Sequence, residues 1–167
     1  MTESADDLLH AVLLPLHDDR LLLPNLALAD SLAPAALRAP GGEAPDWFAG
    51  WLAWQHLDLP VLQFERLIGG SHDSGGRRGR IAVLQALTPG AGEPRCAVLC
   101  ERHPQLLRLA RDGLEALPMR ASDVPELALA RVRLRSDARE ALIPDLAAIE
   151  QRLAALLDAG AALAARS

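Results

Sequence analysis

Histidines, cysteines and one Ser-His-Asp tripeptide are the residues of this chain whose types could support catalysis or metal binding. The five histidines, at positions 10, 17, 56, 72 and 103, do not pair at the short spacing of a metal site. Ser71-His72-Asp73 has the residue types of a hydrolase triad, but a triad converges in space and adjacent residues rarely do. We therefore expect no catalytic residue and no metal site, and we retain only His56, as a recognition residue.

Sequences that bind phosphate-containing cofactors are also missing. A P-loop needs a lysine, and all 17 basic residues are arginine. There is no GxGxxG, and the glycine-rich run at 69–79 lies between predicted strands, with no helix N-terminus to receive a phosphate. The sequence therefore predicts no cofactor and gives an enzymatic function little support.

Cys96 and Cys100 lie in one predicted strand. Four strand steps separate them by roughly 13 Å, whereas a disulfide requires about 4.4–6.8 Å between the two Cα atoms. We expect both to be reduced thiols that are buried as small hydrophobic side chains.

Charge and hydropathy narrow the possible partners. The formal net charge is −5 without a long run of one sign, which argues against nucleic acid as the main partner. No apolar run reaches the ~18–20 residues of a membrane span, and the acidic start MTESADDLLH lacks the basic region of a secretory signal. We expect a cytoplasmic protein that does not insert directly into a membrane.

The stretch from Asp46 to Gly69 holds all three tryptophans and both phenylalanines of the chain. Residues 47–55 and 57–64 are typical of two apolar strands that meet at a tight corner, Gln55-His56. This concentration of aromatic side chains without catalytic groups favours packing and recognition over chemistry.

Strand geometry predicts how this hairpin is arranged. Alternation places Trp47 and Trp51 on one face and Phe48 and Trp54 on the other. One face can fill a core, so the second must be covered by another element or by a partner. Pro60 indicates an edge strand or the start of a strand, because proline cannot donate to a ladder.

The remaining chain shows many short strands separated by turns, a pattern typical of a barrel or a sandwich. Residues 1–9 are expected to be a flexible tail, and 10–165 one domain of two coupled halves that divide near 70–95. Further strands are predicted at 10–16, 21–24, 80–87, 95–101, 106–109, 127–135 and 138–143, with a link at 25–32, a loop at 33–45, a helical turn at 64–68 and a turn-rich segment at 113–125.

Two further segments are candidates for contact with a partner. Arg77, Arg78 and Arg80 cluster at the end of the glycine-rich loop, either as solvated residues or as a docking point for an acidic partner. From Pro144-Asp145 onwards, apolar residues at helical spacing predict a helix of about 20 residues, roughly 30 Å long. This helix either packs on the sheets or binds a partner or a second copy of the chain.

Three stretches of the chain resemble the CheW-like adaptor domains of bacterial chemosensory systems: residues 12–30, 50–62, and 96–143 with the following helix. The second of these, GWLAWQHLDLPVL, is similar to the family signature G-x-x-N-L-R-G-x-x-x-P-V-V. The pattern DWFAGWLAWQ…LPVLQFERL more narrowly resembles the ChpC-type relatives of type IV pilus chemosensory systems.

The match to this signature is partial. Gly50 and Pro60-Val61 agree with it, whereas Gln55-His56 replaces its Arg-Gly and Ala53 its Asn. Asp30 stands where an acidic residue is usual in the family. In the family the Arg-Gly corner belongs to the coupling surface, so its replacement implies a different set of partners.

The resemblance implies a mainly β fold of two packed five-stranded SH3-like β-barrels with a C-terminal helix and a hydrophobic groove between the barrels. It implies a non-catalytic adaptor without a cofactor, which couples the tip of a methyl-accepting chemoreceptor to the regulatory domain of a CheA-type histidine kinase. The setting that it implies is type IV pilus (twitching) signalling, with recruitment to receptor arrays at the inner membrane. The alternative is a divergent β-barrel binding module that has lost receptor coupling and binds another protein or a small ligand.

The residues expected to carry this function fall into two groups. The protein-binding residues are Asp30, Trp54, Gln55, His56, Asp58, Arg77 and Arg78, and the structural residues are Gly50, Trp51, Pro60 and Val61.

Overall fold

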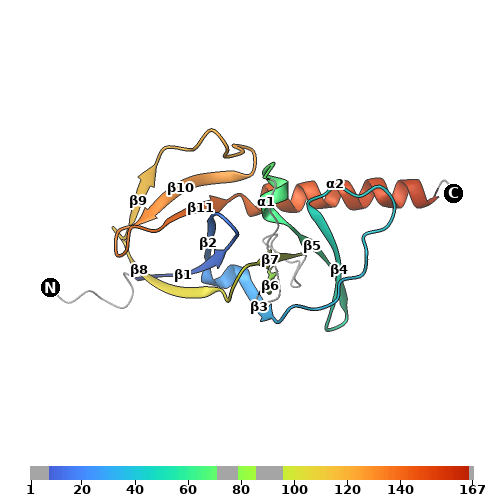
Figure 1. Cartoon of the computed structure of the whole chain (residues 1–167), viewed down its shortest axis with the longest axis horizontal. Coiled ribbons are helices and arrows are strands. Elements are labelled where there is room, and N and C mark those ends of the chain that lie inside the picture. Colours follow the sequence, from blue (N-terminus) through green and yellow to red (C-terminus); the bar gives the residue numbers. More distant parts are fainter. Residues whose placement is uncertain (1–7, 71–78, 86–95, 166–167) are drawn as a thin grey trace.

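A computed structural model of the protein describes residues 8–70, 79–85 and 96–165, with side chains described as far as residue 158. The chain is mainly β, with two short helical turns and one long C-terminal helix (Figure 1). Its strands are β1 (Leu8–Pro15), β2 (Arg20–Pro24), β3 (Leu28–Leu32), β4 (Phe48–Trp54), β5 (Leu57–Leu62), β6 (Arg80–Leu84), β7 (Cys96–Cys100), β8 (Gln105–Ala110), β9 (Leu114–Leu117), β10 (Ala128–Leu134) and β11 (Glu140–Pro144). The helical elements are η2 (Asn25–Ala27), α1 (Phe64–Leu67) and α2 (Leu146–Ala165).

The strands form two sheets that lie side by side, one on the left and one near the centre of Figure 1. The first has six strands in the order β8-β1-β2-β11-β10-β9, and the second has five in the order β3-β6-β7-β5-β4. The prediction of a mainly β fold with a C-terminal helix is confirmed. The number of strands is corrected for one sheet, which has six and not five.

Two strands were not predicted. β3 lies in the segment expected to be a link, and β9 lies in the segment expected to be turns. Each is an edge strand of four or five residues: β3 pairs with β6 from a distant part of the chain, and β9 pairs with β10, the next strand along it. Their own sequences carry little periodic signal, because pairing with the neighbouring strand and not local pattern decides their conformation.

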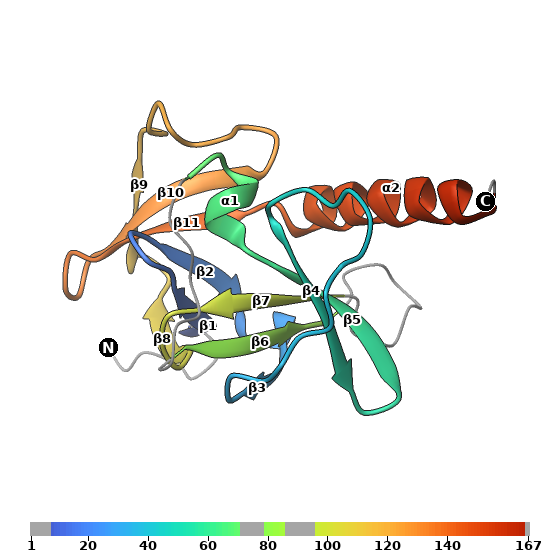
Figure 2. The same cartoon turned by 45° about the vertical axis from the view of Figure 1, so that its right-hand side comes forward.

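The chain changes sheets twice. It enters the five-stranded sheet after η2, leaves it after β7 and returns to the six-stranded sheet at β8 (Figure 2). The expected division near 70–95 therefore falls inside the segment that builds the five-stranded sheet, so the two sheets do not separate there. The first strand also begins at Leu8, two residues inside the expected tail.

Three apolar clusters show how the sheets pack. Along β1, Ala11 and Leu13 point into a cluster enclosed by the six-stranded sheet, while Val12 and Leu14 point into a shared core that also contains residues of the second sheet. The five-stranded sheet has its own cluster around Leu52. β1 is thus buried on both faces, which is why its sequence is continuously apolar instead of alternating.

The shared core is completed by the two helices. Phe64 of α1 is 1% exposed, and Ile149 and Leu153 of α2 are buried in the same cluster. Asp145 begins α2 as its N-cap, since its Oδ1 accepts a hydrogen bond of 3.1 Å from the backbone N–H of Ala148. The predicted helix opening is therefore confirmed.

The described side chains of α2 are buried against the sheets only as far as Leu153. After Leu153 the described side chains are mostly exposed, and Leu157 is 37% exposed. In Figure 1 the helix continues past β4 and β5 and ends away from both sheets. The helix was expected either to pack on the sheets or to bind a partner or a second copy of the chain. Its described part packs on the sheets as far as Leu153. Among the described residues, no helix is long and apolar enough to cross a membrane.

Pro60 lies in an interior strand, which corrects the expectation of an edge. β5 stands between β4 and β7, but β7 pairs with it only at Val61 and Leu62. Trp51 lies opposite Pro60 in the ladder, but its backbone N–H and C=O both bond to Arg38 on the other side of β4. The Trp51–Pro60 pair is therefore a non-hydrogen-bonded pair. No ladder bond is therefore lost at the proline.

We expect neither cysteine of the folded protein to react with a thiol reagent. Cys96 and Cys100 are both free and buried, and burial is the main cause that raises the pKa of each thiol to about 12. At pH 8 the thiols stay protonated and shielded, whereas the thiolate is the reactive form. Titration with a chromogenic disulfide should show no fast-reacting thiol in the native protein and two in guanidinium chloride. A fast-reacting native thiol would contradict the burial.

Candidate protein-binding site

The β4–β5 hairpin ends in the two-residue turn Gln55-His56, between the paired residues Trp54 and Leu57. Both turn residues are exposed, as is Asp58 on the returning strand. Gln55 adopts φ 53°, a left-handed conformation that two-residue hairpin turns need and that favours glycine. The predicted corner is confirmed in position and exposure.

Asp30 and Trp54, both predicted as binding residues, are in direct contact. The indole Nε1 of Trp54 donates a hydrogen bond of 2.9 Å to Asp30 Oδ2, and the other oxygen of Asp30 accepts one of 2.8 Å from the backbone N–H of Ser31. The carboxylate of Asp30 therefore ties β3 to the end of β4. It fixes the orientation of the indole ring beside the exposed corner.

Trp51 and Asp58 are joined through Arg38, a residue that the sequence analysis did not select. The guanidinium carbon of Arg38 lies 5.8 Å from the centre of a Trp51 ring, and its Nη2 is 3.5 Å from Asp58 Oδ2. The backbones of Arg38 and Trp51 also exchange two hydrogen bonds, of 3.0 and 2.8 Å. Arg38 lies in the loop at 33–45, where no local pattern indicates that it bridges to β4.

Gly50 makes this bridge possible. A Cβ added at Gly50 would lie 2.5 Å from the carbonyl oxygen of Arg38, and its φ of 143° is rare for residues with a side chain. The loop around Arg38 thus lies directly on the backbone of β4. The structural role predicted for Gly50 has a direct physical cause in this close approach.

The predicted alternation of aromatic residues is wrong at the start of β4. A register shift between Phe48 and Gly50 inserts one extra residue, so Phe48 falls on the same side as Trp51. Their rings make an edge-to-face contact with centroids 5.3 Å apart. Trp54 packs instead on the cluster inside the five-stranded sheet, and Trp47 on the shared core.

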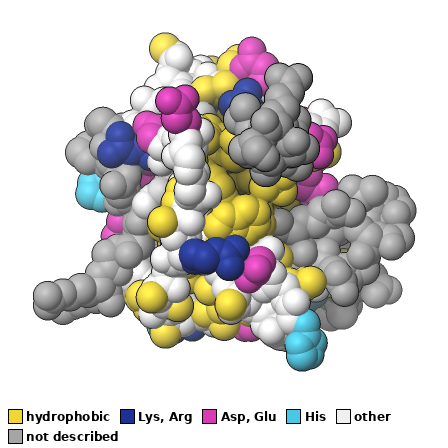
Figure 3. All heavy atoms as spheres, turned by 90° about the vertical axis from the view of Figure 1, so that its right-hand side faces the viewer, with side chains coloured by type: hydrophobic (Ala, Val, Ile, Leu, Met, Phe, Trp, Pro, Cys, Tyr) yellow, Lys and Arg dark blue, Asp and Glu magenta, His cyan; other side chains and the backbone are white. Residues whose placement is uncertain are grey.

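A groove of about 370 Å³ lies between β5 and α2, beside the corner. Its floor is apolar and includes Trp51, Pro60 and Leu153, whereas Asp58 and Asp158 stand among its polar lining residues. Figure 3 views this end of the molecule and shows hydrophobic side chains gathered beside one basic and one acidic group. α2 therefore covers the second face of the hairpin only in part.

The structure thus brings most of the predicted binding residues to one end of the five-stranded sheet. Asp30, Trp54, Gln55, His56 and Asp58 all lie on or beside the hairpin. Arg77 and Arg78 lie outside the described residues.

Among the described residues, no group of three or more His, Cys, Asp or Glu side chains could hold a metal ion. Their one buried cluster of carboxylates around a cation is Arg131 with Asp19 and Asp123. In it every guanidinium bond is directed to a carboxylate, at 2.7–3.2 Å. The four bonds hold the β1–β2 turn against β10.

Replacing Gln55 with glycine should stabilise the fold by about 1 kcal/mol, because glycine adopts a positive φ without the steric cost that other residues carry. Urea denaturation would measure the change. His56→Gly is the matched control, since His56 is not among the residues with positive φ, and it should give no gain. Equal stabilisation by both variants would contradict the strain at Gln55.

The fold and the site define a class: a mainly β protein of two packed sheets, with an exposed hairpin corner beside half-buried tryptophans and a groove. No model of a known protein family matches the chain, and no curated protein matches it. Among solved structures, the fold is similar to the crystal structure of the scaffolding protein TtCheW from Thermoanaerobacter tengcongensis, with a TM-score of 0.66 and 13% sequence identity. The match covers 82% of this chain and 88% of that chain. The CheW-like fold expected from the resemblance is therefore confirmed.

Proposed function

We propose that this protein is a non-catalytic adaptor that binds partner proteins through the end of the β4–β5 hairpin and the groove beside it. The observation that carries the proposal is the exposed corner Gln55-His56, next to an apolar groove that contains Trp51. Fixed aromatic side chains at a surface are typical of binding interfaces, because they bury much area at little entropic cost. The fold that the chain shares with a scaffolding protein supports the same proposal.

The partners proposed are the regulatory domain of a CheA-type histidine kinase and the tip of a methyl-accepting chemoreceptor. The proposed setting is type IV pilus signalling, in the cytoplasm at receptor arrays. Support for these comes from the sequence resemblance around Gly50 and Pro60-Val61, together with the CheW-like fold. The exchange of Arg-Gly for Gln55-His56 leads us to propose that the corner is adapted to its own receptor.

Binding titrations with the purified kinase domain and a receptor fragment test this proposal. We expect the full chain to bind at least one of them, and His56→Ala or Asp58→Ala to weaken that binding by about tenfold. Ser136→Ala is the matched control, because Ser136 is an exposed turn residue of the other sheet. Failure to bind either protein would refute the proposal.

The alternative is a β-barrel binding module that has lost receptor coupling and binds another protein or a small ligand. The observation that favours it is the absence of the family's Arg-Gly from the corner. Changing Gln55-His56 to Arg-Gly separates the two functions. A gain of receptor binding would support lost coupling, whereas loss of an existing interaction would show that Gln55-His56 is itself used.

A further inference from the structure

A second pocket, of about 280 Å³, lies at the end of the six-stranded sheet and is lined mainly by basic and polar side chains. Leu13 and Pro15 of β1 form its apolar part, and Gln105 of β8 is paired with Leu13 across the ladder. Arg20 of β2 is opposite Pro15 in the neighbouring ladder. The remaining lining residues, Arg102, His103 and Arg139, come from the connections before β8 and β11.

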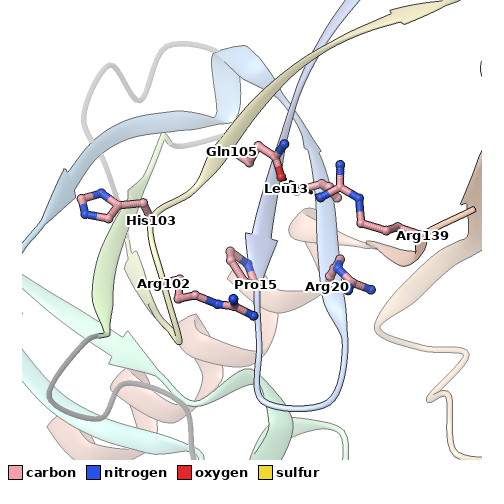
Figure 4. A pocket seen from close by; sticks show the side chains of 7 residues that line it. All are labelled: Leu13, Pro15, Arg20, Arg102, His103, Gln105 and Arg139. Atoms are coloured by element: carbon pink, nitrogen blue, oxygen red, sulfur yellow. Dashed lines mark hydrogen bonds between the residues drawn. The ribbon is translucent and has the colours of Figure 1, made fainter. Parts of the chain in front are cut away.

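The pocket lies at the open end of the apolar cluster inside this sheet. Leu13 is 1% exposed and belongs to that cluster, so the pocket is the mouth of a curved sheet and not a shallow dip between loops. The mouths of such sheets are frequent binding sites in β proteins. Figure 4 shows Arg20, Arg102 and Arg139 around Leu13 and Pro15, while the ring of His103 points away from them.

The three guanidinium groups are only partly neutralised. Arg139 donates to Asp137 at 2.8 Å and to Gln105 Oε1 at 2.6 Å, so one carboxylate and one amide hold it in place. Among the described residues, the Arg20 side chain donates a hydrogen bond of 3.4 Å to the carbonyl oxygen of Glu140, and its charge also acts on Asp137. No hydrogen bond or ion pair joins Arg102 to any of the described residues. The residues that line the pocket include these three arginines and no carboxylate, so its lining is positively charged.

We propose that this pocket binds an acidic segment of a protein partner, with a carboxylate of that segment held between Arg102 and Arg20. Guanidinium groups bind carboxylates through paired, charge-assisted hydrogen bonds. The apolar floor of Leu13 and Pro15 suits the methylene groups of a glutamate side chain. The site lies on the other sheet from the β4–β5 hairpin, so it can be occupied together with that hairpin.

The surroundings favour a protein segment over an anionic membrane. Asp137 and Glu140 flank the pocket beside Arg139, and Glu101 precedes Arg102. A flat anionic bilayer would bring its charges against these carboxylates as well as against the arginines. A single inserted side chain avoids them, because it enters only the mouth.

Fluorescence anisotropy of a labelled hexaglutamate peptide with the full chain at low salt tests the proposal. We expect saturable binding that hexaglutamine does not show, weakened about tenfold by Arg102→Gln and by Arg20→Gln. Arg108→Gln is the matched control and should bind as the wild type does. Arg108 is exposed on β8. Its neighbours Leu107 and Leu109 pack on the cluster inside the sheet, and Arg108 lies between them on the outer face.

Three results would overturn the proposal. One is no peptide binding by the wild type, and another is an equal loss in Arg108→Gln, which would indicate unspecific attraction. The third is tighter binding of inorganic phosphate or of phosphatidylserine vesicles through Arg102, which would assign the pocket to a phosphate group. The variants His56→Ala and Asp58→Ala do not alter this pocket. A failure of the peptide-binding test is therefore distinguishable from a failure of the proposed adaptor function.

Discussion

Arg131→Ala is expected to destabilise the protein by about 3–5 kcal/mol, the range typical of breaking a buried ion pair from one side. The Arg131 side chain is 2% exposed and bonds Asp123 through Nε and Nη2, at 2.9 and 2.7 Å. It also bonds both oxygens of Asp19, at 3.2 and 2.7 Å. Without the guanidinium, two carboxylates, one of them 2% exposed, would face each other with no cation between them, and each would keep one backbone hydrogen bond.

Arg133→Ala is the matched control for this measurement. Arg133 lies two residues further along β10 and pairs with Glu115 and Glu140 at 3.4 and 3.3 Å, but its side chain is 39% exposed. Exposed ion pairs contribute little, so we expect a loss below about 1 kcal/mol. Urea denaturation of both variants at pH 7 decides the comparison. A smaller loss for Arg131→Ala than for Arg133→Ala would contradict the structural role of the cluster.

The same cluster predicts a dependence of stability on pH. The hydrogen bond from Arg131 is the main cause that holds the pKa of Asp123 below its ordinary value. A carboxyl whose pKa is lowered in the folded state contributes stability above its unfolded pKa of about 4, and this contribution is lost as the pH falls through the folded value. Asp123→Asn should therefore be less stable at pH 7 and should lose this part of the acid dependence.

The second large effect is expected for Gly50→Ala, which should lower the free energy of unfolding by about 3 kcal/mol or more. The added Cβ would lie 2.5 Å from the carbonyl oxygen of Arg38. To relieve this contact the backbone at Arg38 would have to move, because the clashing atom does not belong to a flexible side chain. The φ of 143° adds conformational strain. The loop should therefore move away from β4, and Trp51 should lose its two backbone bonds to Arg38.

Gly41→Ala provides the control for this prediction. Gly41 also has a positive φ, of 77°, but no atom lies within 4 Å of its added Cβ. Only the conformational cost remains, about 1 kcal/mol. Thermal unfolding of the two variants separates the close approach from the backbone preference. Equal losses would show that the contact with Arg38 is not what requires glycine at position 50.

The elements that the sequence predicted well are those whose residues carry a strong local signal. The hairpin between Trp54 and Leu57, the helical turn from Phe64 and the long helix after Asp145 are recognisable from apolar spacing, turn length and capping. The CheW-like fold followed from a motif around Gly50 and Pro60.

The contacts that build the candidate sites depend on residues that are distant in the chain. Arg38 meets Trp51 through an isolated bridge between its loop and β4, and it meets Asp58 because β5 pairs with β4. Asp30 meets Trp54 although β3 and β4 are the two edge strands of the five-stranded sheet. One inserted residue at the start of β4 placed Phe48 on the face opposite to the predicted one. No periodicity reports such an insertion, because it depends on the register of the partner strand.

By itself, the sequence determined that this protein is mainly β, with an aromatic hairpin and a capped C-terminal helix, since hydrophobic pattern and turn chemistry act over a few residues. Tertiary structure alone decided that the chain changes sheets at β3 and β8, and that Arg131 is paired with two carboxylates. It also decided that three arginines meet at the mouth of the six-stranded sheet. These features join segments that are up to 119 positions apart, as Arg20 and Arg139 are, and strand pairing sets their distance in space.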